Sequence, residues 1–366
     1  MSGETMGVEE EFLLVAASSG ATAAVAEEVF DRASGAELPV GASIQRELRD
    51  TQIEAATGVC STSADLREQL LAGRRALAGA GRPDDVLVVP SGTPAVAAEV
   101  EPGAPATKRF AVIDGLFAGV TRDYEACGLH VHVGVADPDT AVAVINHLAR
   151  WLPTLLALSA NSPFHQGRDT GYASWRNVQQ ARFPGFGLPP HVSDFDQFRA
   201  ENARLVDCGA LADVNQTFWF ARPSNKWPTV EIRIADTAAT VDDAILQALV
   251  TRALVRTALA DLALGREAPP LPAQVASAAV WSAARYGLDG PGVDLDQGKQ
   301  VPATRLLADL VEHVRDALVD AGDRDEVEGL LRAVHTRGAG ASRQRQLAAA
   351  GGLPGVMRAL SLDPEG

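Results

Sequence analysis

Three pairs of polar residues with the spacing i, i+2 fall in segments whose other residues are typical of β-strands. The pairs are Glu9 and Glu11, His130 and His132, and Glu231 and Arg233. Because side chains alternate between the two faces of a strand, the members of each pair point to the same face. The alternation is most regular in the segment LHVHVGV at 129–135, where both histidines lie opposite an apolar face. These segments therefore predict polar faces that can carry chemistry.

A fourth extended segment, 44–57, contributes Glu47 and Glu54. If the four segments share one sheet, its polar face gathers glutamates, two histidines and an arginine. Like charges at such short range are unstable unless protons or cations neutralise them. Carboxylate oxygens with an occasional imidazole suit a hard divalent cation, Mg²⁺ or Mn²⁺. Glutamates on an outer strand face are often only solvated, so the pattern leaves that interpretation open beside a metal site.

The segment 161–192 has neither helical nor strand periodicity and is rich in Gly, Pro, Arg and aromatic residues. An aperiodic segment of this length in a compact domain is usually functional or mobile. It contains Arg168, Tyr172 and Arg176. An arginine can bind a substrate carboxylate or a nucleotide phosphate through two parallel hydrogen bonds. Ion pairs within the protein are the alternative role for these arginines.

The remaining pattern indicates which elements position these residues. Strands are expected at 7–15, 86–89, 129–135, 214–221 and 229–235, with the extended segment 44–57 beside them. Helices are expected from an N-cap at Thr62 or Ser63, from Asp137-Pro138 with a break at Pro153, and from Thr240 onward. A strand-rich region at 1–236 precedes a mainly helical region at 237–366, without a βαβ rhythm. This order predicts a single α+β domain over 1–366 with a mainly antiparallel sheet.

The composition argues against several classes of protein. Of the 366 residues 46% are hydrophobic, which is enough for a core, and 32 basic against 47 acidic residues give a net charge of −15. Phosphate polyanions would be repelled, so we expect no nucleic-acid partner and no membrane partner. No apolar run of about 18 residues and no secretory signal is recognisable, and the three cysteines form no CxxC pair. A cytoplasmic protein with small-molecule partners is the expectation.

Six sequence motifs occur in the order found in one family of enzymes. They are GVEEEF at 7–12, CGLHVHVGV at 127–135, SANSPFHQGRDTGYAS at 159–174, RPS at 222–224, TVEIRIAD at 229–236 with VDDA at 241–244, and GAGASRQR at 338–345. In these motifs the chain resembles the glutamate–cysteine ligase type 2 family, the bacterial carboxylate–amine ligases, over roughly residues 6–346.

The resemblance implies a glutamine-synthetase-like catalytic fold, in which a strongly curved, mainly antiparallel sheet forms a funnel with helices outside. It implies ATP-dependent ligation of a carboxylate to an amine with Mg²⁺ or Mn²⁺, and it suggests a homodimer. The metal ligands that it implies are Glu9, Glu11, Glu47, Glu54, His130 and Glu231. Arg233 would face the ATP phosphates and, with Glu54, act in catalysis. The substrate candidates are Arg168, which would also contact the nucleotide, Tyr172, His132 and Arg176.

Two positions depart from the family pattern. His165 stands where an aromatic residue is expected, and Phe220 stands where an acidic residue is expected. Both departures were expected near the substrate pocket, where loss of an acidic group would remove a partner for a substrate ammonium. They predict poor use of glutamate with cysteine compared with another pair, such as one with a more apolar amine.

Other activities fit parts of the same pattern. A HxH pair on a strand with distant glutamates also suits a Zn²⁺ or Fe²⁺ hydrolase or a cupin-like enzyme, although such sites usually need a third histidine. A catalytically silent binding protein of the same fold is a further alternative. No GxxxxGK[ST] motif occurs, so any ATP would be held by metals and scattered basic residues.

Overall fold

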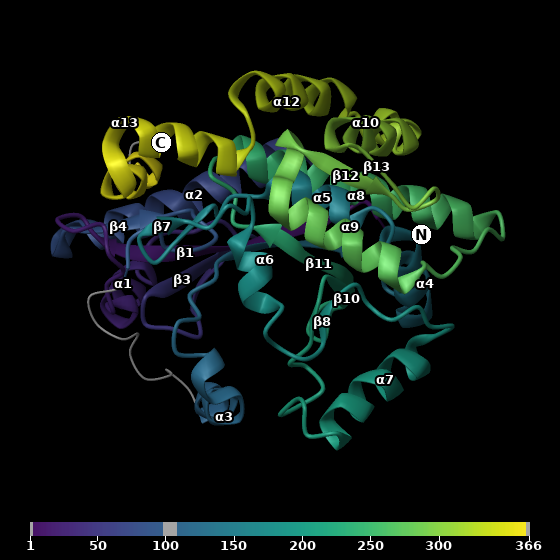
Figure 1. The fold of residues 1–366 in the computed structure, drawn as a ribbon, viewed down its shortest axis with the longest axis horizontal. Helices are drawn as coiled ribbons and strands as arrows, with labels where there is room; N and C mark the ends of the chain where they lie inside the picture. Colours follow the sequence, from purple (N-terminus) through teal and green to yellow (C-terminus); the bar gives the residue numbers. More distant parts are fainter. Residues whose placement is uncertain (1–2, 98–107, 364–366) are drawn as a thin grey trace.

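The computed structural model describes residues 3–97 and 108–363, and a seven-stranded antiparallel sheet lies at its centre (Figure 1). The strand order is β10-β11-β5-β1-β3-β2, and β4 pairs with the second half of β1. The strands are β1 Met6–Ala16, β2 Ser43–Arg46, β3 Gln52–Ala56, β4 Val86–Val89, β5 Gly128–Gly134, β10 Ala221–Pro223 and β11 Thr229–Asp236. All of them precede residue 237, as the sequence predicts.

The strand register brings the predicted polar residues together on neighbouring strands. Glu9 on β1 is paired with His130 on β5, and Glu11 on β1 is paired with Glu54 on β3. On the other side of β5, His132 is paired with Glu231 of β11. The segments that carry the polar pairs are therefore adjacent strands of one sheet, although they are separated by up to about two hundred residues in the chain.

Apolar residues on the opposite faces of the same strands build the core. Val131, Val230 and Ile232 belong to one large buried cluster, which helices cover from outside. The helices that contact these strands are α2 Ser63–Gly81, α5 Leu152–Ser159 and α8 Val241–Ala263. Strict alternation in β5 and β11 thus separates an apolar side, which packs on helices, from the polar side.

Local capping chemistry sets the helix starts that the sequence predicts. Thr62 caps α2, and Asp137 caps α4 Pro138–Leu148 with Pro138 in the first turn. Thr240 and Asp243 form a reciprocal capping box at the start of α8. The predicted helix after residue 137 is divided before Pro153, where α4 and α5 meet at a bend of 70°. No other helix pair, and no single helix, in residues 3–97 and 108–363 has the length and apolar character needed to cross a membrane.

Three predicted segments differ from the structure in detail. The extended segment 44–57 is the hairpin β2–β3, and Glu47 lies in its turn rather than on a strand. The aperiodic segment 161–192 contains β6 Phe164–His165, β7 Arg168–Asp169, α6 Trp175–Gln180 and β8 Phe186–Gly187. The strand expected at 214–221 begins only at β9 Phe218–Trp219. The sequence lacks periodicity at these places because the elements are two to six residues long.

The second half of the chain is mainly helical, with one additional hairpin. The hairpin is β12 Pro291–Asp294 and β13 Lys299–Pro302. The helices are α9 Ala273–Tyr286, α10 Ala303–His313, α11 Arg315–Ala321, α12 Arg324–Arg337 and α13 Gly340–Leu360. The remaining helices before residue 237 are α1 Ala26–Ala33, α3 Lys108–Phe117 and α7 Phe195–Asp207. That all these elements form one domain remains a prediction.

A buried carboxylate at the end of β11 joins distant segments of the chain. Asp236 accepts hydrogen bonds from the Asn161 amide at 2.8 Å and from the hydroxyls of Ser162 and Ser174 at 2.7 and 2.8 Å. Asn161 in turn accepts two hydrogen bonds from the Gln344 side chain on α13. Three of the six sequence motifs contribute residues to this junction, which gives the GAGASRQR motif a structural role.

Candidate metal centre

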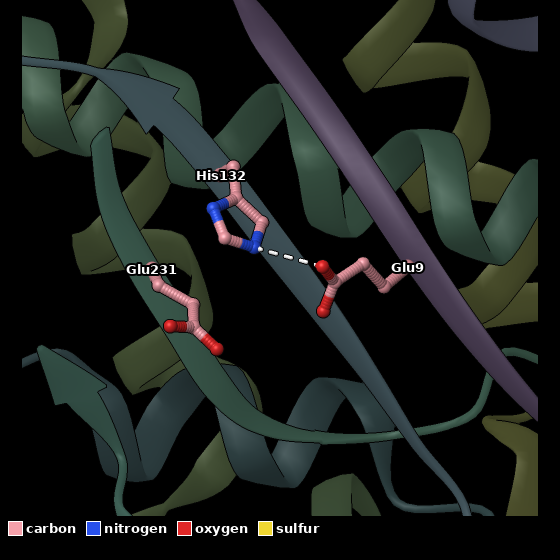
Figure 2. A group of neighbouring side chains, drawn as sticks. All are labelled: Glu9, His132 and Glu231. Atoms are coloured by element: carbon pink, nitrogen blue, oxygen red, sulfur yellow. Dashed lines mark ion pairs between the residues drawn. The ribbon is translucent and has the colours of Figure 1, made fainter. Parts of the chain in front are cut away.

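The centre is built around the carboxylate of Glu9, which lies between two histidines. One oxygen of Glu9 is 3.0 Å from Nδ1 of His130, and the other is 3.4 Å from Nε2 of His132. Figure 2 shows Glu9, His132 and Glu231 reaching toward one another from three neighbouring strands. The Nε2 atom of His130 is also 3.5 Å from a carboxylate oxygen of Glu11. The alternation of the strands therefore places these side chains on one face.

Side chains on this face form three sets of three residues. Within each set, one oxygen or nitrogen atom of each residue lies within 4.8 Å of the corresponding atoms of the other two. The sets are Glu9, His132 and Glu231; Glu9, Glu54 and His130; and Glu11, Glu47 and Glu54. They contain all six predicted metal ligands and add His132. Hard divalent cations take such oxygen-rich ligand sets. A typical zinc hydrolase would need a third histidine ligand. In the described part of the chain, His130 and His132 are the only histidines in these sets.

Several carboxylates lie close together in the centre, and this proximity affects which of them are protonated. Burial, followed by the charge of Glu11, raises the pKa of Glu47 to about 8. Burial, followed by the charge of Glu47, raises the pKa of Glu54 well above its usual value. Burial alone would raise the pKa of Glu9 as well, but its close contacts with His130 and His132 hold it far below its usual value. Protonation of Glu47 and Glu54 thus reduces the repulsion among the carboxylates, and bound cations can reduce the same repulsion.

Two imidazole nitrogens in the centre are free to bind a cation. Nε2 of His130 and Nε2 of His132 are buried and have no hydrogen-bond partner within the described residues. Nδ1 of His132 is 2.9 Å from the hydroxyl of Thr229, which fixes the ring orientation. Burial, followed by the charge of Arg233, lowers the pKa of His130, which favours the neutral form of the ring. A neutral imidazole with an unpaired nitrogen beside carboxylates fits a metal ligand.

Two arginines hold the carboxylate of Glu231. Arg233 contacts Glu231, and its Nη1 atom is 3.3 Å from Nδ1 of His130. Arg222 on β10, the direct partner of Glu231 across the sheet, donates to both of its oxygens at 2.8 and 3.3 Å. Burial would raise the pKa of Glu231, but the charges of Arg233 and Arg222 hold it well below its usual value. Sequence reasoning missed Arg222, although it lies in the RPS motif.

Two candidates from the aperiodic segment contact residues other than the predicted metal ligands. Arg168 is exposed on the β6–β7 hairpin, opposite His165. Tyr172 accepts a hydrogen bond from Trp281 at 3.3 Å, and Arg285 lies over its ring.

Arg176 is only 1% exposed. Its guanidinium donates to the backbone carbonyls of Arg233 and Ile234 at 3.2 and 3.3 Å. The structure therefore gives Arg176 a supporting role beneath β11 instead of an open surface for substrate. Its burial could not be read from the sequence, because the six-residue helix that carries it has no recognisable period.

Both positions that depart from the family pattern are buried. Phe220 is 1% exposed and packs against Phe186 in the main core, so it does not remove a charge from the polar face. His165 is 2.9 Å from the Gln179 side chain, and burial lowers its pKa to about 4. The prediction that Phe220 alters a substrate pocket loses its structural basis, because its side chain faces the apolar side.

Comparison with solved structures shows which known proteins share the fold of this chain. The crystal structure of glutamate–cysteine ligase from Francisella tularensis in complex with AMP matches with a TM-score of 0.72 at 13% identity, over 97% of this chain and 88% of that one. A bifunctional glutathione synthetase from Pasteurella multocida matches with a TM-score of 0.58 at 14% identity, over 98% of this chain and 54% of that one. These likenesses confirm the predicted glutamine-synthetase-like fold class, with its open, mainly antiparallel sheet.

Sequence relatives are much closer. The family model for glutamate-cysteine ligase family 2 (GCS2) matches residues 5–360. A Saccharopolyspora erythraea protein named "Putative glutamate--cysteine ligase 2-2" is 52% identical, over 96% of this chain and 90% of its own length. A Salinispora arenicola protein named "Putative glutamate--cysteine ligase 2" is 42% identical, over 94% of this chain and 90% of its own length. The chain belongs to glutamate-cysteine ligase family 2, which confirms the resemblance and supports an amide-forming ligase.

Proposed function

We propose that this protein is an ATP-dependent carboxylate–amine ligase that forms a γ-glutamyl-type amide bond through an acyl phosphate and releases ADP and phosphate. The observation that carries the proposal is the convergence of glutamates, two histidines and Arg233 on one sheet face. Membership of the ligase family supports the same reaction class. A carboxylate needs such activation because oxide is a very poor leaving group.

The six predicted ligands Glu9, Glu11, Glu47, Glu54, His130 and Glu231 would hold Mg²⁺ or Mn²⁺, with His132 beside them. When bound, these cations neutralise charge on the ATP phosphates and on the phosphoryl group in transfer. Arg233 would add a fixed guanidinium on the same face and bind phosphate oxygens through its planar fork. Arg222 keeps Glu231 in position from the adjacent strand.

The barrier to this reaction is largely electrostatic, because a substrate carboxylate must approach the polyphosphate of ATP. A preorganised cationic group lowers such a barrier, and loss of one positioned donor typically reduces kcat by about 10²- to 10³-fold. We assign this role to Arg233 and keep Glu54 as the catalytic carboxylate among the metal ligands. Arg168 and Tyr172 remain proposed contacts of the nucleotide and the amino acid.

The test is ADP release by the purified chain with Mg²⁺, ATP and a panel of carboxylic acids and amines that includes glutamate with cysteine. Hydroxylamine added in place of the amine should give a hydroxamate if an acyl phosphate forms. Glu231→Gln should abolish both products, whereas Glu328→Gln on the exposed helix α12 is the matched control and should leave them unchanged. Absence of ADP with every pair, from a folded and metal-loaded protein, would contradict the proposal and favour a silent binding protein.

A further inference from the structure

Glu10 is the middle one of three consecutive glutamates on β1, and its side chain is buried. Side chains alternate along a strand, so Glu10 points to the face opposite that of Glu9 and Glu11. It is 1% exposed, and its neighbours across the sheet are the buried apolar residues Ala55 and Leu129. Because a carboxylate in apolar surroundings is unfavourable without a partner, Glu10 needs a compensating contact.

The compensating contact comes from Arg74 of helix α2, which packs against β1 (Figure 1). The guanidinium donates to both oxygens of Glu10, from Nε at 3.0 Å and from Nη2 at 2.6 Å. Nη2 also donates to the carbonyl of Ala238 at 2.8 Å, and the guanidinium lies 5.6 Å from the centre of the Phe12 ring. The pair therefore joins β1, α2 and the residues just before α8 inside the core.

A buried ion pair is not needed for stability alone. Apolar side chains of similar size often give equal or greater stability at such a position, because the two charges lose their hydration on burial. What the pair adds is a requirement for one geometry, since two parallel hydrogen bonds fix both the place and the direction of the carboxylate. Arg74 thus restricts where the middle glutamate of β1 can lie.

The sequence of β1 makes this restriction important for the metal centre. A shift of a strand by one residue exchanges its two faces. With three glutamates in a row, the shifted strand would still present a glutamate to the centre, but Glu9 and Glu11 would lie among apolar residues. Each of the three metal-ligand sets contains Glu9 or Glu11. The register of β1 therefore decides whether the centre can form.

We propose that the ion pair of Arg74 and Glu10 is a positioning device, which holds β1 in the register that brings Glu9 and Glu11 to the metal centre. Both residues act through the strand and are not themselves ligands. The proposal deepens the proposed function, because it rests on the metal centre described above. Its first consequence, a firmly held β1, does not depend on bound metal.

The test replaces the pair with apolar side chains of similar size, in the variant Glu10→Leu with Arg74→Met. Its Tm should stay close to that of the parent chain, as for other buried ion pairs replaced in this way. Amide hydrogen exchange in EDTA should become faster at residues 8–12 of β1. Isothermal titration should show about tenfold weaker binding of Mn²⁺, as for other groups that orient metal ligands.

A second buried ion pair provides the matched control. Arg252 of α8 contacts Asp323, and both side chains are as buried as the first pair but lie outside β1. Arg252→Met with Asp323→Leu should leave Mn²⁺ affinity and the exchange rates of β1 unchanged. Arg74→Lys keeps the charge but cannot make the paired hydrogen bonds, so its Mn²⁺ affinity should lie between those of the parent chain and of Glu10→Leu with Arg74→Met.

Parent-like Mn²⁺ affinity together with parent-like exchange of β1 in the folded variant Glu10→Leu with Arg74→Met would overturn the proposal. If that variant does not fold, the single changes decide, and equal losses of Mn²⁺ affinity in Arg74→Lys and Arg252→Lys would overturn it. A parent chain that binds no Mn²⁺ would refute the metal centre and with it the ligase proposal. The exchange rates in EDTA would then still decide whether the pair holds β1.

Discussion

At the scale of single residues, Arg233 is the group whose removal should separate activity from stability. Arg233→Lys retains a positive charge beside Glu231 but loses the planar fork that binds phosphate. We expect kcat for ADP release to fall by about 10²- to 10³-fold, as for loss of one positioned donor, with little change in Tm. Steady-state kinetics and thermal unfolding check this. A large fall in Tm with normal turnover per folded molecule would show that Arg233 serves only as a structural ion pair.

His165 gives a pH dependence whose sign can be worked out. Burial lowers the pKa of His165 to about 4, below the value of 6.5 for a free histidine. As the pH falls below 6.5 the unfolded chain takes up a proton that the folded chain refuses, so the free energy of unfolding decreases between pH 6.5 and pH 4. Above pH 6.5 the residue contributes no pH dependence.

We therefore expect His165→Gln to lose less stability than the parent chain when the pH is lowered from 6.5 to 5. Urea unfolding at several pH values measures the difference. His335→Gln, at an exposed position on α12, is the control for a histidine outside the core. Parallel pH profiles for the parent chain and His165→Gln would contradict the assignment.

At the scale of elements, the junction of β5, β11 and α6 tolerates no side chain at Gly128. A Cβ atom there would lie 2.2 Å from the guanidinium of Arg176, which donates to the backbone of β11. We expect Gly128→Ala to destabilise the protein by about 1–3 kcal/mol, as overpacking of a core does, and to lower turnover through displacement of β11. Gly115→Ala on α3, where a Cβ meets nothing within 4 Å, is the matched control. Equal Tm values for the two variants would argue against this packing constraint.

The elements that sequence predicts correctly are those whose cause is local. The alternation of apolar and polar residues in β5 can be recognised from adjacent positions. The N-caps at Thr62, Asp137 and Thr240 can be recognised because each side chain accepts a hydrogen bond from the backbone N–H three residues later. Arg222 was missed because its role depends on a partner across the sheet. Arg176 was assigned to substrate because nothing within its short helix reveals that it is buried.

At the scale of the whole molecule, the carboxylates that would bind the metal should lower the stability of the metal-free protein. Glu11, Glu47 and Glu54 lie within 4.8 Å of one another, and this crowding destabilises the metal-free fold. We expect Glu54→Gln to raise the Tm of the metal-free protein by about 2 °C, a shift that corresponds to about 1.5 kcal/mol for a chain of 366 residues. The same change should remove most of the further rise in Tm that saturating Mg²⁺ gives the parent chain.

The measurement is thermal unfolding with EDTA and with increasing Mg²⁺. Glu125→Gln provides a comparison with a buried glutamate outside the metal-ligand sets, where the Thr51 hydroxyl donates to the carboxylate. A lower Tm for Glu54→Gln in EDTA, together with an unchanged response to Mg²⁺, would mean that Glu54 belongs to the framework of the fold and not to the metal centre.

The hydrogen bonds around Asp236 also bear on the order in which parts of the fold can form as the chain is synthesised. The sheet is complete in sequence once residue 236 has been synthesised, but the hydrogen bonds to Asn161 and Ser91 await Gln344, more than a hundred residues later. Contacts between such distant segments form slowly, because the chain must lose the entropy of closing a long loop before the contacts can stabilise it. We therefore expect all strands of the sheet to have been synthesised before the Gln344 hydrogen bonds can form, so that these contacts are among the last to complete the fold.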